Sequence, residues 1–331
     1  MKAIQIQEYG APSVLVLRDV VEPEPGNGEV RIKLSVAGVS FGDTYMRRGY
    51  YAPPHTYPTK LPYIPGLDGW GYIDAVGPGV TEWSVGELVT YCMGYHSYAQ
   101  YVTVPAWKVV KIPPNFEPDI ACALMINGLT AYYLTHFLYP LKSGDTCLIH
   151  AGAGSVGQMV IQLAKSRGAR VITTVGSKEK GELARERGAD VIVYYREVDF
   201  VEEVRKATDG RGVDVAYDSV GLETYRRSMK CLRKRGVCSL YGAASGIPDC
   251  VRPMEDLAEN GSIFVTRSHL AHYITNKKEL DDAANLLFSA YTAGKLAVAL
   301  HGKTLGLEDA AEAHRALENR ETTGKILLRV P

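Results

Sequence analysis

The sequence has no surplus of either charge: 37 lysines and arginines balance 37 aspartates and glutamates over 331 residues. A nucleic-acid-binding domain usually carries a basic surplus, so this balance argues against that class. No uninterrupted apolar run approaches the ~18 residues of a membrane span, and the N-terminus lacks the shape of a signal peptide. The six cysteines contain no Cys-x-x-Cys pair, so we expect reduced, buried thiols in a cytoplasmic protein.

The length of the chain alone favours two domains. The pattern of predicted secondary structure also changes near Pro118. Before Pro118, short β-rich segments alternate with glycine and proline clusters, which is typical of a partly closed β-barrel. These segments are Lys2–Gln7, Val14–Val20, Glu29–Val36, Gly69–Val76, Glu87–Cys92 and Tyr98–Val104. After Pro118 comes a possible helix, Asp119–Leu138, which Asn127-Gly128 is expected to interrupt.

Beyond residue 140, strands and helices alternate, which predicts a parallel sheet covered on both faces. The predicted strands are Thr146–His150, Arg170–Val175, Asp190–Tyr194, Val213–Tyr217, Val237–Tyr241 and Ser262–Thr266. Among the predicted helices are Ser155–Arg167, Lys178–Arg187, Phe200–Thr208, Leu222–Arg233 and Lys277–Ala293.

A glycine-rich loop follows the first strand of this sheet. Thr146–His150 runs directly into a full G-x-G-x-x-G, and the apolar residues after it recur with the spacing of one helix face. Glycines permit a tight turn and close backbone approach, and a pyrophosphate is bound by the N–H groups and the positive dipole at a helix start. Because strand, loop, helix and next strand fall in the order that a dinucleotide-binding fold requires, we predict a cofactor loop. Its residues are Gly152, Gly154, Ser155, Val156 and Gly157.

The tip of the second strand indicates which dinucleotide is bound. An NAD site places Asp or Glu there, about 20 residues after the loop, to bind the ribose hydroxyls. Here Arg170–Val175 ends in Gly176-Ser177-Lys178-Glu179-Lys180, with no acid at the tip and with a hydroxyl and two lysines beyond it. A 2′-phosphate favours such groups, so NADPH is the predicted cofactor, bound by Gly176, Ser177 and Lys180. The alternative is that the lysines form the solvated first turn of a helix, and Glu179 also argues against a phosphate.

Several motifs together resemble one family. They are Gly38–Asp43 with Tyr45, Pro65-Gly66-x-Asp68-Gly69, Asn127–Ala131, Ala151–Gly157, Tyr195-Arg196-Glu197, Tyr217–Gly221 and Val265-Thr266-Arg267. Over essentially its whole length the chain resembles the medium-chain dehydrogenase/reductase superfamily, and within it the zinc-independent quinone oxidoreductases (the zeta-crystallin group). The resemblance implies an α/β protein with two domains. A GroES-like β-barrel substrate domain comprises residues 1–124 and is completed by 268–331, and an inserted Rossmann domain with a doubly wound parallel sheet comprises 125–267.

The resemblance also implies further cofactor residues and the absence of zinc. In the family, cationic and phenolic groups bind the 2′-phosphate, and the matching positions are Lys180, Tyr195 and Arg320. Tyr241 is a further predicted cofactor-binding residue. Zinc-dependent relatives have a catalytic cysteine where this chain has Ser40, and Gly-His-Glu where it has Gly66-Leu67-Asp68. Of their four-cysteine lobe only Cys92 occurs. Because a tetrahedral zinc site needs thiolate and imidazole ligands, we expect no metal.

Without a Lewis acid, the implied reaction is hydride transfer from NADPH to an acceptor that takes it up readily: a quinone or another α,β-unsaturated carbonyl compound. Candidate residues around the acceptor are Ser40, Asp43, Tyr45, Tyr51 and Asn127. Tyr51 aligns with the proton-donating tyrosine of the related mitochondrial enoyl reductases. Quinone reductases of the group often have Asn at position 40, and some have Lys at position 127, so this chain departs from the quinone pattern twice.

Two other functions stay open. One is a dedicated enoyl or haloacrylate-type reductase, which reduces an activated C=C bond and needs a positioned proton donor. The other is a non-catalytic NADPH-binding protein, crystallin-like or RNA-binding. Its support is a basic stripe on the predicted helix Leu222–Arg233 and its end, although such a run is usually a solvated face. The apolar strand Ser262–Thr266 is expected at a sheet edge, where family members pair as homodimers.

Overall fold

The computed structural model describes residues 1–50 and 59–331. The chain divides into two compact units, and both ends of the sequence belong to the first. Unit one comprises Met1–Asn127, Ile274–Ser289 and Val298–Pro331, and unit two comprises Gly128–Tyr273 and Ala290–Ala297.

Unit one is organised around one long strand. β3 (Glu29–Val39) buries alternate side chains along much of its length, as expected of a strand with one face on the core. It pairs with three strands, β15, β4 and β6, and this multiple pairing curls the sheet towards closure. The strand order is β14-β15-β3-β4-β5-β7, with β6 paired to β3, and β1 and β2 form a separate antiparallel pair. The bounds are β1 Lys2–Gln5, β2 Val16–Asp19, β4 Asp68–Val76, β5 Leu88–Cys92, β6 Tyr101–Pro105, β7 Val109–Lys111, β14 Leu305–Gly306 and β15 Ile326–Arg329.

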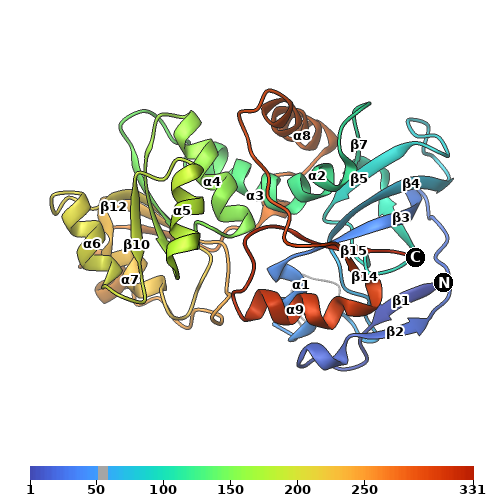
Figure 1. The fold of residues 1–331 in the computed structure, drawn as a ribbon, viewed down its shortest axis with the longest axis horizontal. Helices are drawn as coiled ribbons and strands as arrows, with labels where there is room; N and C mark the ends of the chain where they lie inside the picture. The colour runs from blue at the N-terminus through green and yellow to red at the C-terminus, as the bar shows by residue number, and fades with distance from the viewer. Residues whose placement is uncertain (51–58) are drawn as a thin grey trace. The chain divides into compact units, whose positions relative to one another are not determined.

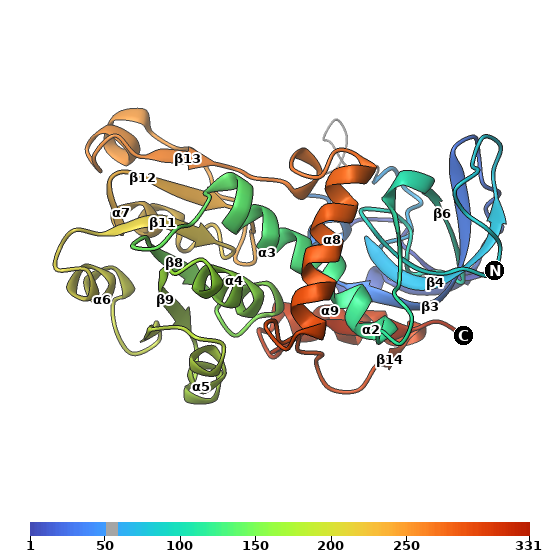
Figure 2. The same ribbon diagram turned by 90° about the horizontal axis from the view of Figure 1, so that it is seen from above.

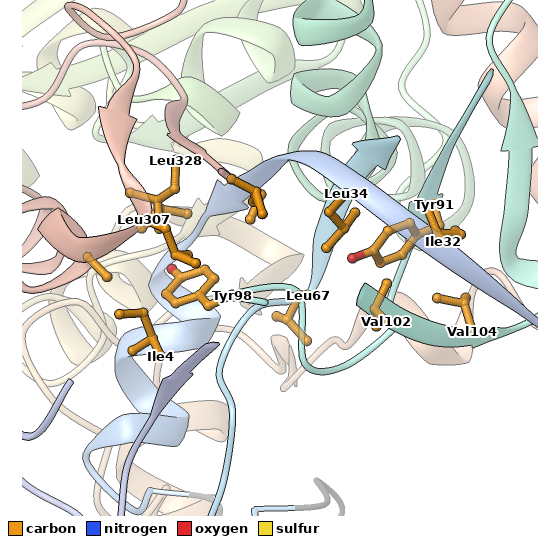
Figure 3. Close-up of a cluster of buried hydrophobic side chains, with 14 of the residues drawn as sticks. Ile4, Ile32, Leu34, Leu67, Tyr91, Tyr98, Val102, Val104, Leu307 and Leu328 are labelled. Carbon is orange, nitrogen blue, oxygen red and sulfur yellow. The ribbon is translucent and has the colours of Figure 1, made fainter. Parts of the chain in front are cut away.

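The C-terminal end of the chain completes this sheet. β15 runs antiparallel to β3, with Ile326 opposite Val39, so the red and blue ends of the chain lie side by side (Figure 1). The core beneath the sheet draws on segments far apart in sequence. Figure 3 shows Ile4, Leu34, Tyr98, Leu307 and Leu328 among its buried side chains. The predicted GroES-like barrel is confirmed.

Unit two contains a six-stranded parallel sheet in the order β10-β9-β8-β11-β12-β13. Thr146 on β8 lies opposite Arg170 on β9. The chain order changes direction at β8, so the loop after β8 lies at a topological switch point, where open sheets of this kind bind ligands. The bounds are β8 Thr146–His150, β9 Arg170–Val175, β10 Val191–Tyr194, β11 Val213–Asp218, β12 Leu232–Leu240 and β13 Phe264–Thr266.

Helices connect these strands, and Figure 2 shows α3 and α4 side by side along the sheet. The predicted doubly wound Rossmann fold is confirmed. The helix bounds are α1 Phe41–Arg47, α2 Pro118–Ala123, α3 Leu129–Tyr133, α4 Ser155–Ser166, α5 Lys178–Glu186, α6 Phe200–Ala207, α7 Tyr225–Lys230, α8 Lys277–Thr292 and α9 Ala310–Glu318. Short 3₁₀ or π turns lie at Pro12–Val14 (η1), Ala106–Lys108 (η2), Leu124–Gly128 (η3), Leu134–Leu138 (η4), Pro253–Ala258 (η5), Leu270–His272 (η6) and Leu307–Asp309 (η7).

Asn127-Gly128 does not interrupt the helix before the Rossmann sheet, so that prediction is wrong. Gly128 has helical backbone angles, and α2 continues through η3 into α3. Extra residues are absorbed as π turns, which keep the backbone hydrogen-bonded. Among the described residues this run, Pro118–Leu138, is the one helix long and apolar enough to span a membrane, and 72% of its most apolar window is buried inside the protein.

The predicted helix Leu222–Arg233 is also wrong at its end. α7 stops at Lys230, and β12 already begins at Leu232. Between Val213 and Val215 on β11 the register with β12 shifts, so Arg233, Lys234 and Arg235 lie in an irregular segment of a strand. Arginine and lysine favour helices locally, but pairing with β11 overrides that preference.

Candidate active site

The glycine loop of unit two leaves no room for a side chain at its third glycine. α4 begins at Ser155, with Gly154 as its N-cap and no side chain capping it. A Cβ atom at Gly157 would lie 2.3 Å from the carbonyl oxygen of Ala151 and 2.9 Å from Cα of Gly152. The loop and the helix start are therefore in backbone-to-backbone contact, and the first helical N–H groups are presented for an anion. This geometry fits the pyrophosphate of a dinucleotide.

At the tip of β9, Gly176 lies close to Tyr195 and Arg196, which follow it by about twenty positions in the sequence. A Cβ atom at Gly176 would lie 2.9 Å from the Tyr195 hydroxyl oxygen and 3.5 Å from Nε of Arg196. Ser177 caps α5, and its side chain accepts a hydrogen bond from the Lys180 N–H at 3.4 Å. A phenol, a guanidinium and a helix N-terminus thus surround the strand tip, and this donor set fits a phosphate monoester. Sequence reasoning missed Arg196, although it stands within the Tyr195-Arg196-Glu197 motif.

Glu179 is the one carboxylate in the first turn of α5. A hydrogen bond from the Ser177 side chain lowers the pKa of Glu179, so the group is anionic at neutral pH. It lies at the exposed surface, on the turn that carries Lys180.

Tyr241 and Arg320 are the two other residues predicted to bind the cofactor. Tyr241 directly follows β12, and its N–H donates to the Asp218 carbonyl at 3.0 Å. Arg320 follows α9 in unit one and has a left-handed backbone, with φ of 61°. The cofactor roles of both residues stay predictions.

A buried cluster of polar side chains lies in unit one around Lys325, which immediately precedes β15. The Lys325 ammonium donates to Asp68 at 2.7 and 3.0 Å, to the Ser40 hydroxyl at 3.0 Å and to Asn127 Oδ1 at 3.4 Å. The side chains of Lys325 and Asp68 are wholly buried. The charge of Asp68 raises the pKa of Lys325 against the opposing effect of burial. The cluster therefore has a buried ammonium–carboxylate ion pair at its centre.

Gly38 makes room for this pair. A Cβ atom at position 38 would lie 2.3 Å from Asp68 Oδ1 and 2.6 Å from Lys325 Cε. The glycine of the Gly38–Asp43 motif is thus explained by a side chain almost three hundred residues away.

Asp43 extends the cluster on the side of α1. Its carboxylate accepts a hydrogen bond from the Ser40 N–H at 2.7 Å and one from the Tyr98 hydroxyl at 3.4 Å. The Tyr98 hydroxyl in turn lies 3.0 Å from Nε2 of His314. Burial, and then the charge of Asp68, raise the pKa of Asp43 to about 7. Burial lowers the pKa of His314 to about 3, so the imidazole is neutral.

The structure thus brings together Ser40, Asp43 and Asn127, three of the residues predicted around the acceptor. It adds Lys325 and Asp68, to which sequence reasoning gave no role. Tyr45 lies on α1, is 5% exposed, and packs between Phe41 and Tyr50. Tyr51 lies outside the described residues.

No group of three or more His, Cys, Asp or Glu side chains within residues 1–50 and 59–331 could hold a metal ion. All six cysteines have free thiols, and five of them are buried. Ser40 and Asp68 occupy the positions that align with the zinc-binding motifs of zinc-dependent relatives. In this chain both residues contact the positively charged Lys325 ammonium.

Known sequence families match both units. Residues 26–114 match the alcohol dehydrogenase GroES-like domain, and residues 155–289 match the family described as zinc-binding dehydrogenase. A 2-haloacrylate reductase of Burkholderia sp is 41% identical over 98% of both chains. Quinone oxidoreductase 1 of Escherichia coli is 36% identical, again over 98% of both chains. The chain belongs to the quinone oxidoreductase group of the medium-chain dehydrogenases/reductases.

Solved structures of this group superpose over the whole chain. A quinone oxidoreductase of Escherichia coli complexed with NADPH gives a TM-score of 0.93 at 36% identity and covers 99% of this chain and 100% of its own. A mycobacterial relative complexed with NADPH gives the same score at 41% identity, with the same coverage. The predicted family and fold class are therefore confirmed.

Proposed function

We propose that this chain reduces quinones or other α,β-unsaturated carbonyl compounds with NADPH, without a metal. The observation that carries the proposal is the tip of β9, where Gly176 meets the Tyr195 hydroxyl and Arg196 in place of a carboxylate. Full-length relatives named for quinone and 2-haloacrylate reduction support it, and so do two similar structures that were solved as complexes with NADPH. The predicted enzyme class, quinone oxidoreductase, and the predicted cofactor, NADPH, are confirmed by these relatives and their structures.

The residues of unit two bind and orient the cofactor in this proposal. Bound NADPH would supply a hydride. The N–H groups at the start of α4 bind the pyrophosphate, with Gly152, Gly154 and Gly157 permitting close approach. Ser177, Lys180, Tyr195 and Arg196 bind the 2′-phosphate. Tyr241 and Arg320 complete the predicted set.

Ser40, Asn127, Tyr45 and Tyr51 face the acceptor in this proposal. Of the polar cluster in unit one, Ser40 and Asn127 retain some exposure, 8% and 6%. A hydroxyl and an amide at such openings bind a carbonyl oxygen, and phenol rings offer flat apolar faces to a planar acceptor.

One observation favours a second candidate, a dedicated reductase of activated C=C bonds. The 2-haloacrylate reductase is 41% identical, whereas the quinone oxidoreductase of Escherichia coli is 36% identical. C=C reduction requires a proton donor at the α-carbon, and Tyr51 is the candidate. Tyr51→Phe should then lower kcat by about 10²–10⁴. With a quinone, solvent protonates the stabilised phenolate, and the loss should stay below about tenfold.

The experiment is a panel of quinones, enones and 2-haloacrylates, with NADPH oxidation followed by absorbance. We expect turnover with NADPH in the presence of a chelator and far less than one zinc per purified chain. Tyr45→Phe is measured beside Tyr51→Phe as a control. It should chiefly raise KM, because a contact that only positions the acceptor affects binding more than the chemical step. Stoichiometric zinc, or turnover that the chelator abolishes, contradicts the metal-free mechanism.

We also propose that the protein is a cytoplasmic homodimer, paired through β13. This strand is the last of the parallel sheet, and Phe264 at its start is 62% exposed. An uncovered edge with an apolar side chain is a template for pairing with another strand. Sedimentation should give twice the chain mass, and Phe264→Lys should shift it towards the monomer. The free thiols fit a reducing compartment.

A further inference from the structure

The Lys325 ammonium has as many acceptor groups as it has protons. An ammonium carries three N–H donors and accepts nothing. Asp68, Ser40 and Asn127 lie within 3.4 Å of Nζ, one group for each donor. Because Lys325 is wholly buried, water is not an alternative partner. The ammonium therefore fixes the orientation of each neighbour.

The two neighbours that retain some exposure, Ser40 and Asn127, respond in the same way. Ser40 accepts from Lys325, so its own hydroxyl proton must point away from the ammonium. Within the described residues, that proton has no acceptor. The Asn127 oxygen must face the ammonium, since a lysine can only donate, and this places the amide nitrogen on the other side. Each of these two groups thus turns a donor away from the ammonium.

We propose that Lys325 is a positioning residue of the acceptor site, which aims the Ser40 hydroxyl at the acceptor's carbonyl oxygen and polarises it. The inference rests on the proposed function. Ser40 would be the catalytic residue, because it touches the oxygen, and Lys325 acts through it. A buried ammonium then stands one hydroxyl away from the atom on which charge develops.

The chemistry needs such a charge. Hydride addition to the β-carbon of an enone moves the C=C electron pair to the carbonyl oxygen, and the resulting enolate takes one proton at its α-carbon from a donor in the site or from solvent. The hydride and its two electrons come from NADPH, which leaves as NADP⁺. A prearranged donor backed by a fixed positive charge stabilises the oxyanion as it forms, because it does not have to reorient during the reaction.

Stability alone does not explain the cluster. A buried ion pair can often be replaced by apolar side chains without loss of stability. Here the pair instead adjoins two polar residues that retain some exposure, Ser40 and Asn127, at 8% and 6%. The charge therefore lies beside polar side chains and not within a uniformly apolar core.

The first experiment removes the hydroxyl and asks which acceptor is affected. Ser40→Ala should lower kcat with methyl vinyl ketone by roughly 10²–10³, the effect of losing one oxyanion donor, while Ser40→Thr retains most of the rate. With benzoquinone the loss should be smaller, since its reduced anion is less basic. The NADPH dissociation constant should stay within about twofold. Equal losses with both acceptors, or no loss with either, overturn the inference.

The second experiment removes the charge without leaving an unpaired ion. Lys325→Met combined with Asp68→Leu should fold, lower kcat with methyl vinyl ketone at least tenfold, and make the further effect of Ser40→Ala small, since the two residues act as one unit. The matched control, Lys165→Met with Asp190→Leu, removes an ion pair of unit two and should leave kcat within about twofold. Should the first double variant not fold, Lys325→Gln combined with Asp68→Asn keeps N–H donors without either charge, and the same small further effect of Ser40→Ala is expected.

Independent, additive losses would falsify the coupling between Lys325 and Ser40. A parent enzyme that is active while Ser40→Ala keeps its full rate contradicts this inference alone. If the parent protein does not oxidise NADPH with any acceptor of the panel, that result contradicts the proposed function as well.

Discussion

The two units prepare their polar sites with different materials. In unit two the phosphate loop is backbone against backbone, and its chemistry comes from N–H groups at a helix start. In unit one the cluster is made of side chains, with a wholly buried Lys325–Asp68 pair at its centre. The backbone site of unit two depends on the absence of side chains at a few glycine positions. The side-chain site of unit one depends on each charged or polar group keeping the partner that balances its charge or accepts its hydrogen bond.

The largest expected effect tests the buried pair. Lys325→Met leaves the Asp68 carboxylate buried without its cation, and breaking such a pair costs about 3–5 kcal/mol. The corresponding change in unit two, Lys165→Met, breaks a pair whose side chains are 35% and 36% exposed and should cost about 0–1 kcal/mol. Chemical denaturation of the two variants measures the difference. Equal shifts in the unfolding midpoint contradict the contrast between the sites.

A smaller effect is expected from adding one methyl group to the loop. Gly157→Ala places a Cβ atom against the backbone of Ala151, so the loop must shift, which typically costs about 1–3 kcal/mol. Gly154→Ala meets only the Ala151 carbonyl oxygen, at 3.2 Å, and should lower the melting temperature less than Gly157→Ala does. Both variants should bind NADPH more weakly, as fluorescence titration can show. Unchanged affinity in Gly154→Ala would mean that the pyrophosphate lies elsewhere.

The specificity for NADPH should depend on a single side chain at the tip of β9. The parent protein should bind NADPH at least tenfold tighter than NADH, about 1.4 kcal/mol. Lys180→Ala should remove much of that preference and leave NADH affinity nearly unchanged, because only the 2′-phosphate loses a partner. Lys206→Ala, an exposed lysine on α6, is the control and should change neither affinity. Equal affinities of the parent protein for both nucleotides contradict the proposed phosphate site.

The same contrast explains what the sequence could reveal. The cofactor loop was predictable because strand, glycines and helix are contiguous, so local spacing carries the whole pattern. The cluster was only partly predictable: Ser40 and Asn127 came from a family resemblance, but Lys325 meets Ser40 across 285 residues and belongs to no local motif. Likewise, α7 was predicted too long because helix preference is local, whereas the pairing of β12 with β11 is set by the tertiary fold.

The smallest expected effect is the pH dependence of the parent protein's stability. It is small because two buried groups of unit one, Asp43 and His314, make stability change with pH in opposite directions. Burial raises the pKa of Asp43 to about 7, so the folded protein holds a proton that the unfolded chain releases above pH ~4. This group alone makes stability fall as pH rises from ~4 to about 7. Burial lowers the pKa of His314 to about 3, so the unfolded chain holds the extra proton below pH 6.5. This group alone makes stability rise between about pH 3 and pH 6.5.

Between pH ~4 and pH ~6.5 the two slopes have opposite signs, each at most about 1.4 kcal/mol per pH unit, and they largely cancel. Asp43→Asn should therefore give a protein whose stability rises with pH across this window, and His314→Gln one whose stability falls. Asp68, Lys325 and Tyr98 face Asp43, and Arg47, Arg48 and Tyr98 face His314; all are present in both variants. Denaturant midpoints measured across the window give the two slopes. Variants that both keep the parent's slope would show that Asp43 and His314 titrate alike in the folded and unfolded chains.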